Sequence, residues 1–280
     1  MSKKKILVPT DFTKAGRCAE GHAIRTAEIV DGEVYFLHIV GDKEELEGAR
    51  EKLEKEVEER NKDHNVEIHP MVRVGSIFED IGDAAAEVEA ELIFMGTHGM
   101  KGMQYLKGSN AMRVIKHSSV PFIVVQEKPI DEKGYDDIVV PLDLSKETKQ
   151  KLDITVNLAK YFDSRIHLIT PQETDEFLKN QLERNLHFAE DFFKENGVEY
   201  TTKSVDEKAS NFVRTIIRHA SEKNADLITI VNLQENSLLG AFASSEEQKL
   251  ITNEAQVPVM VINPHQTTDP SSVTFSTEGG

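Results

Sequence analysis

The segment from residue 96 to residue 110 combines glycines with small polar residues in an arrangement that could bind phosphate. Gly96 and Gly99 follow the apolar run Leu92–Met95, and Gly108-Ser109 stands where a helical pattern begins. Glycine lets the backbone approach a ligand closely, and the unpaired N–H groups at a helix start attract anions. We therefore predict a phosphate-binding loop here. The alternative, that the first two glycines only form a tight turn, stays open.

Two other kinds of residue could take part in chemistry. Asp11 follows the apolar run Ile6–Pro9, and its carboxylate could contact a ligand, cap the next helix, or do both. His98 could act as a general base, but nothing in the sequence supplies a partner to orient its ring, so we expect a turn residue. We expect His64 and His69 to be surface residues, since no Cys and His cluster has zinc-site spacing.

Composition narrows the class of protein. The 280 residues are 39% hydrophobic, which is enough for packed cores in two domains. A formal net charge of −16 argues against non-specific nucleic-acid binding, which needs a basic surface. No apolar stretch approaches the roughly 20 residues of a membrane span, and the start resembles no signal peptide. The single cysteine, Cys18, fits a reducing compartment, and we expect it buried on a helix face. These features predict a cytoplasmic protein without a membrane partner.

Four segments of the first half recur in order in the second half, at an offset that grows slowly from 132 to 137 residues. Such collinear matches indicate a duplication with a few inserted loop residues. The matched pairs are residues 5–13 with 137–145, 65–67 with 197–199, 90–93 with 225–228, and 120–125 with 257–262.

Within each copy, short apolar runs alternate with segments of helical periodicity, which predicts a parallel sheet covered by helices on both faces. We predict two tandem doubly wound α/β domains with five strands each, whose ligands bind beyond the carboxyl ends of the strands. We expect domains at residues 1–128 and 135–264 and a disordered tail at residues 265–280. The predicted strands are 6–9, 34–40, 66–74, 92–95, 121–126, 138–141, 165–170, 199–205, 227–231 and 259–262, and the predicted helices include one capped by Thr13 and those at 43–61, 77–88, 108–117 and 176–195.

Four motifs follow one another in the first copy: Val8-Pro9-Thr10-Asp11-Phe12, Met95-Gly96-Thr97-His98-Gly99, Gly108-Ser109 and Val120–Val125. Together they resemble the universal stress protein family, and the resemblance extends over both copies. It implies a tandem member with a Rossmann-like fold similar to adenine nucleotide alpha hydrolases. ATP-binding members carry Gly, two residues, Gly, nine residues, and then Gly with Ser or Thr. Here eight residues, Met100 to Lys107, separate the second and third glycines, so the loop is shorter.

The resemblance implies that the first domain binds ATP, with or without Mg. It also implies association through the last strand of each domain, residues 121–126 and 259–262, within one chain or in a homodimer. Carried over by position, Pro9, Thr10 and Asp11 would lie near the adenosine, Val40 would contact adenine through its backbone, and Gly96, Gly99, Gly108, Ser109 and Asn110 would surround the ribose and phosphates.

The second copy departs from this pattern. Val231 stands at the position of Gly96, and Gln234 stands at that of Gly99. Glu246-Glu247 places carboxylates at the helix start, where their charge opposes phosphate binding. We predict no nucleotide in the second domain.

These features favour a stress-response or signalling module that binds ATP or a related adenine nucleotide in its first domain without rapid turnover. The alternative is a scaffold for dimerisation and partner binding that takes no nucleotide, which the short loop and the degenerate second copy favour. A slow ATP hydrolase ranks last, because only His98 and Asp11 offer a base. An enzymatic role therefore stays open but is not expected.

Overall fold

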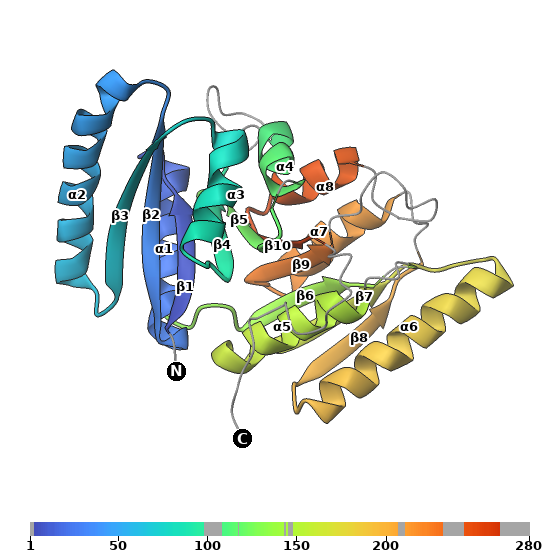
Figure 1. The fold of residues 1–280 in the computed structure, drawn as a ribbon. Coiled ribbons are helices and arrows are strands. Elements are labelled where there is room, and N and C mark those ends of the chain that lie inside the picture. The colour runs from blue at the N-terminus through green and yellow to red at the C-terminus, as the bar shows by residue number, and fades with distance from the viewer. Residues whose placement is uncertain are drawn as a thin grey trace. The chain divides into compact units, whose positions relative to one another are not determined.

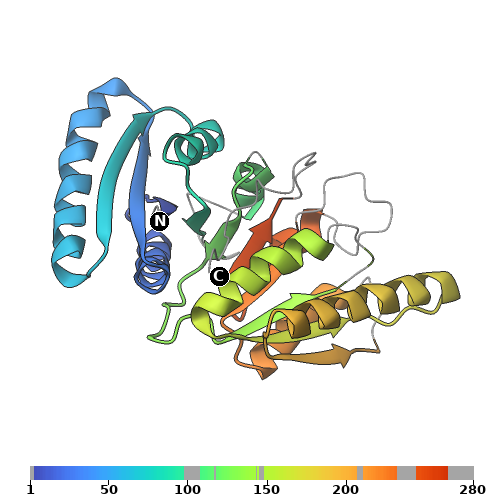
Figure 2. The same ribbon diagram turned by 60° about the horizontal axis from the view of Figure 1, so that its bottom comes forward.

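Short runs of buried apolar residues form the strands of both halves of the chain. The computed structural model describes residues 3–97, 108–116, 118–142, 144, 148–206, 211–231 and 244–263. Contacts divide the chain into two compact units, residues 1–134 and 135–280. Each unit is a parallel sheet with helices packed on it, which confirms the predicted α/β fold class (Figures 1 and 2).

The strands of the first unit run parallel in the order β3-β2-β1-β4-β5. From β1 the chain moves outward to β3 and then returns to the other side of β1 to form β4. This reversal of strand order is the switch point of a doubly wound sheet. Ligands of such sheets bind beyond the strand ends at this point, and we call the region at the carboxyl ends of β1 and β4 the crevice. The strands are β1 (Lys4–Pro9), β2 (Gly32–Val40), β3 (Glu67–Val74), β4 (Leu92–Gly96) and β5 (Phe122–Val125).

Two helices of this unit begin after polar residues whose side chains pair with free N–H groups of the first turn. Thr13 caps α1 (Lys14–Val30) as predicted, because its hydroxyl accepts a hydrogen bond from Gly16 N at 3.2 Å. Ser76 caps α3 (Ile77–Glu87) in the same way, through Phe78 N. The helix predicted at 43–61 is divided into a 3₁₀ turn, η1 (Lys43–Glu45), and α2 (Leu46–Asp63), and α4 spans Gly108–Lys116 (Figure 1).

The centre of the first core lies around β1 and β4. Ile6, Leu7 and Val8 of β1 and Phe94 of β4 are completely buried. Strands covered by helices on both faces cannot alternate polar and apolar residues, which explains the continuous apolar runs seen in the sequence. Cys18 on α1 is half-buried rather than buried as expected, because it lies beside the inward-facing stripe of the helix and not in it.

The second unit repeats this topology in the order β8-β7-β6-β9-β10, so the duplication is visible in three dimensions. Its predicted strands all form, with bounds that differ from the predictions by a residue at most. The elements are β6 (Asp137–Pro141), α5 (Thr148–Phe162), β7 (Arg165–Thr170), α6 (Glu176–Glu195), β8 (Tyr200–Ser204), α7 (Phe212–Glu222), β9 (Leu227–Val231), α8 (Ser244–Ile251) and β10 (Val259–Ile262).

Two expectations from the sequence stay predictions. The tail predicted at residues 265–280 lies outside the described residues. The domain limits at 128, 135 and 264 stay predictions. Among the described residues, no helix is long and apolar enough to cross a lipid bilayer.

Candidate functional site

Gly96 ends β4 in the crevice and packs directly against the first turn of α1. A Cβ atom at this position would lie 2.6 Å from the carbonyl carbon and oxygen of Ala15, and 2.7 Å from Gly16 N. These are backbone atoms of a helix start, so a side chain at residue 96 would push β4 away from α1. The glycine therefore has a packing reason that holds whether or not a phosphate binds beside it.

Asp11 forms the turn between β1 and α1. Its Oδ1 accepts hydrogen bonds from Thr13 N at 3.0 Å and from Thr13 Oγ1 at 2.5 Å. This is an Asx turn that orients the helix cap, so the turn interpretation of Asp11 is confirmed. The residue is also exposed at the carboxyl end of β1, beside Pro9, and its contact with a ligand stays a prediction.

The Thr10 side chain points into the protein, away from the crevice. Its hydroxyl is buried and donates to Glu20 Oε1 at 2.6 Å, while its carbonyl oxygen accepts from His38 Nδ1 at 2.8 Å. Its backbone N–H donates to Leu37 O at 2.8 Å. Because each of these groups has a partner inside the unit, Thr10 positions the end of β1 more than it presents a side chain to a ligand.

The buried carboxyl of Glu20 is a feature that the sequence analysis missed. Glu20 is fully buried in α1, and its Oε2 lies 3.2 Å from the guanidinium of Arg60 on α2. Burial raises the pKa of Glu20 to about 7, although the hydrogen bond from Thr10 and the charge of Arg60 oppose the rise. A signal was present in the sequence, because Glu20 lies four residues after Gly16, on the buried stripe of the helix.

Val40 ends β2 at the same edge of the sheet. Its side chain is 6% exposed, so only its backbone can reach a ligand, as the family resemblance implies. The Val40 carbonyl oxygen already accepts a hydrogen bond from Gly75 N at 2.9 Å. A carbonyl oxygen has two lone pairs, so one acceptor position remains for an adenine amino group.

The start of α4 is the other part of the predicted phosphate site. The helix begins at Gly108, and its first turn contains no acidic residue. Its N–H groups and positive dipole end are therefore free of a competing side-chain anion on the helix itself. His98 and Gly99 lie outside the described residues, as do the side chains of Ser109 and Asn110.

The second unit is built differently at the equivalent place. Val231 ends β9 where Gly96 ends β4, and its side chain is buried. The ammonium of Lys151, from α5, donates to the carbonyl oxygen of Pro141 at the end of β6, at 2.6 Å, and Lys151 is 3% exposed. Glu246-Glu247 supplies the third and fourth residues of α8, and Gln234 lies outside the described residues. An apolar side chain and an internal cation thus reach the strand ends that would face a ligand.

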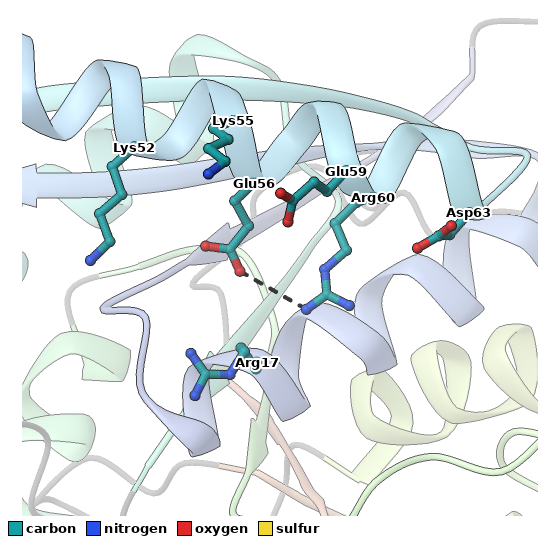
Figure 3. Close-up of a pocket in the computed structure, with 7 residues that line it drawn as sticks. All are labelled: Arg17, Lys52, Lys55, Glu56, Glu59, Arg60 and Asp63. Atoms are coloured by element: carbon teal, nitrogen blue, oxygen red, sulfur yellow. Dashed lines mark ion pairs between the residues drawn. The ribbon is translucent and has the colours of Figure 1, made fainter.

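A polar groove of about 400 Å³ lies between α1 and α2, beside the site and not in it. It adjoins the turn at Phe12, where Lys52 Nζ lies 3.6 Å above the Phe12 ring and Arg17 donates to the Phe12 carbonyl oxygen. Both signs of charge line it, and the Arg60–Glu56 pair spans 3.9 Å within it, so it has no strong preference for an anion. Figure 3 shows the lining residues: Arg17, Lys52, Lys55, Glu56, Glu59, Arg60 and Asp63.

Comparison with known proteins matches this chain to one family in both of its halves. The sequence model of the universal stress protein family matches residues 3–126 and 134–263. A universal stress protein of Methanocaldococcus jannaschii is 34% identical over 144 residues, which span 44% of this chain and 82% of that protein. The family model therefore matches the chain twice, once in each half.

A solved structure that covers both halves of the chain agrees with the family match at the level of the fold. The crystal structure of a universal stress protein from Archaeoglobus fulgidus matches with a TM-score of 0.74 at 19% identity, over 94% of this chain and 99% of that one. A universal stress protein crystallised in complex with cAMP matches 46% of this chain and 97% of its own length, at 18% identity and a TM-score of 0.37. The first of these supports the tandem α/β fold of both units.

Proposed function

The chain belongs to the universal stress protein family, and we propose that its first unit binds an adenine nucleotide, with ATP as the principal candidate. The binding site is the crevice at the carboxyl ends of β1 and β4. Bound nucleotide would serve a stress-response or signalling role, and it would be held without rapid turnover. The second unit binds none.

The observation that carries this proposal is the contrast between the two crevices. In the first unit, β4 ends on Gly96 and the next described element, α4, begins without an acidic residue in its first turn. In the second unit, Val231 and the ammonium of Lys151 reach the equivalent strand ends. A bare backbone and a helix start suit phosphate oxygens, whereas a β-branched side chain excludes close backbone approach.

The described residues fit the nucleotide through backbone groups more than through side chains. The exposed carboxylate of Asp11 and the carbonyl of Val40 would contact the adenosine end, and the N–H groups of α4 would face the phosphates. Asp11 Oδ1 is engaged by Thr13, so this carboxylate is held as a turn element and is a poor general base. This supports binding without rapid hydrolysis.

One observation favours the alternative function, a scaffold that takes no nucleotide. The close contact of Gly96 with Ala15 and Gly16 explains this glycine by packing alone. In that case both units would serve dimerisation and partner binding, and the homodimer predicted through β5 and β10 would be the functional form. Light scattering on the purified chain measures whether such a dimer forms.

Two measurements distinguish a first unit that binds a nucleotide from a scaffold that binds none. Protein purified from cytoplasm, where we propose that it resides, is denatured, and its supernatant is assayed for adenine nucleotide. The melting temperature is then measured with and without ATP, each with and without Mg, because a ligand that binds only the folded state must raise it. Released nucleotide or a raised melting temperature supports the proposal. If no nucleotide is released and millimolar ATP does not change the melting temperature, the scaffold function is supported instead.

A further inference from the structure

Three side chains that can bind metal meet at the amino-terminal ends of β2 and β3, at the opposite end of these strands from the crevice. Glu33 of β2 is in register with Glu67 of β3, and two residues further Tyr35 is in register with His69. Side chains two residues apart on a strand share a face, so all four project from the same face of the sheet. The two strands lie side by side in Figure 1.

The ligand atoms of this cluster face one another without touching. His69 Nε2 lies 3.6 Å from Glu33 Oε2 and 3.7 Å from Glu67 Oε1, beyond hydrogen-bond distance in both cases. One ligand atom from each of the three residues lies within 4.8 Å of the others. The Nε2 atom is itself inaccessible to solvent and has no hydrogen-bond partner among the described residues. A buried ring nitrogen aimed at two carboxylates is thus left with an unmet bonding capacity.

Neighbouring residues hold the ligands in this orientation. The Tyr35 hydroxyl donates to Glu33 Oε1 at 2.8 Å, and Lys3 Nζ donates to Glu67 Oε2 at 3.1 Å. Each carboxylate therefore has one oxygen fixed by the protein and turns its other oxygen toward His69. The imidazole ring is stacked on the Tyr35 ring, with centroids 4.8 Å apart. Outer partners that fix the first ligands in this manner are typical of metal sites.

We propose that Glu33, Glu67 and His69 bind one divalent first-row metal ion, with Zn²⁺ as the best match. One imidazole nitrogen and two carboxylate oxygens are a donor set that zinc accepts. Two ligand atoms about 2.1 Å from a zinc ion at a tetrahedral angle are about 3.4 Å apart. The two distances from His69 Nε2, 3.6 Å to Glu33 and 3.7 Å to Glu67, are already close to this value, and the two carboxylate oxygens, within 4.8 Å of each other, would move together around the ion. The Glu67 and His69 side chains are 56% and 34% exposed, which leaves room for water as a further ligand.

The second unit supplies an internal comparison. Arg165 and Thr201 occupy the positions equivalent to Glu33 and His69, at the repeat offset of 132 residues. The Arg165 guanidinium pairs with Asp137 at 2.8 Å, so a cation that belongs to the protein replaces a carboxylate. The proposed metal site is therefore a property of the first unit alone. It is also independent of the nucleotide, because it lies at the other end of the sheet.

Calorimetry on the full chain, with ZnCl₂ as the ligand after treatment with EDTA and dialysis, tests the proposal. His69→Ala and Glu33→Gln should each weaken zinc binding by at least about tenfold. His64→Ala is the matched control, because His64 is similarly half-buried but faces a single carboxylate, Glu28, at 3.2 Å. It should retain the wild-type affinity. Circular dichroism verifies that each variant is folded.

The metal-free explanation of the cluster is an imidazolium ion placed between two carboxylates. In that case the wild type binds no zinc, or His69→Ala binds it as tightly as the wild type does, and either result overturns the proposal. Nitrogen NMR of the histidine side chains gives a second readout that needs no variant to fold. Zinc should shift the His69 Nε2 resonance of the wild type, and an unmoved resonance at saturating zinc overturns the proposal as well.

Discussion

Replacing Gly96 by alanine is the perturbation whose effect the structure specifies most sharply. The added Cβ would lie 2.6 Å from Ala15 carbonyl atoms, whereas ordinary contacts of this kind begin at 3.4 Å. The contacted atoms belong to the backbone of a helix start, so relief requires movement of β4 or α1 as a whole. Overpacking of this type costs about 1–3 kcal/mol, and we expect the upper end of that range.

Hydrogen exchange with mass spectrometry measures this cost in one unit at a time, which a global unfolding curve of two units would not. Gly96→Ala should accelerate exchange of the β1 and β4 amides by roughly 100-fold, the equivalent of about 3 kcal/mol. Amides of β6 and β9 serve as the internal reference and should not change. Gly21→Ala is the control, since a Cβ there meets no heavy atom within 4 Å. Gly21→Ala should slow exchange of the α1 amides, because alanine stabilises a helix interior by about 0.5–1 kcal/mol relative to glycine.

The reasoning is refuted if Gly96→Ala leaves exchange in β1 and β4 at the wild-type rate. A variant that is destabilised but still binds ATP with wild-type affinity would show that Gly96 serves packing alone. Loss of binding in a variant whose exchange is unchanged would instead assign this glycine to the ligand.

Three other predictions follow from single side chains. The pKa of Glu20 is about 7 in the folded state against an ordinary value of 4.5, so its contribution to stability is complete below about pH 4.5 and is lost as pH rises through 7. Glu20→Gln, which mimics the protonated form, should therefore gain stability relative to the wild type between about pH 5 and pH 8 in urea unfolding, and a pH-independent difference contradicts the assignment. Thr13→Ala removes the cap of α1 and should lower the stability of this helix by about 1 kcal/mol. Hydrogen exchange of the α1 amides measures the loss, and an unchanged exchange rate would contradict the prediction. The Asn253 side chain is buried (2% exposed) and forms hydrogen bonds with Leu250 O, Val257 O and Val257 N. Asn253→Ala should therefore destabilise the second unit by about 3 kcal/mol. A loss below about 1 kcal/mol would show that water replaces the Asn253 amide.

Local sequence signals predict the elements of this protein well. The strands around Ile6 and Phe94 are short continuous apolar runs between helical segments, a pattern that is typical of buried parallel strands. Thr13 is identifiable as a cap because it precedes the first helical turn. These features depend on residues close together in the chain.

Features that depend on pairing between distant segments could not be predicted in this way. Glu33 and His69 meet only because β2 and β3 pair in one particular register, which neither segment encodes alone. The contact between Glu20 and Arg60 likewise requires α1 to lie beside α2. The packing reason for Gly96 is invisible in the sequence, where a glycine between a strand and a loop suggests a ligand or a turn equally well.

The central claim, that the first unit binds an adenine nucleotide and the second does not, is tested most directly by calorimetry with matched charge substitutions. Gly108→Asp places a carboxylate at the first residue of α4. Ser245→Asp places one at the second residue of α8, the position that the repeat offset of 137 residues pairs with Gly108. An acid at a helix start favours the helix itself, so both variants should remain folded.

We expect the wild type and Ser245→Asp to bind one ATP per chain, and Gly108→Asp to bind none. Two sites per chain, or wild-type affinity in Gly108→Asp, would contradict the account.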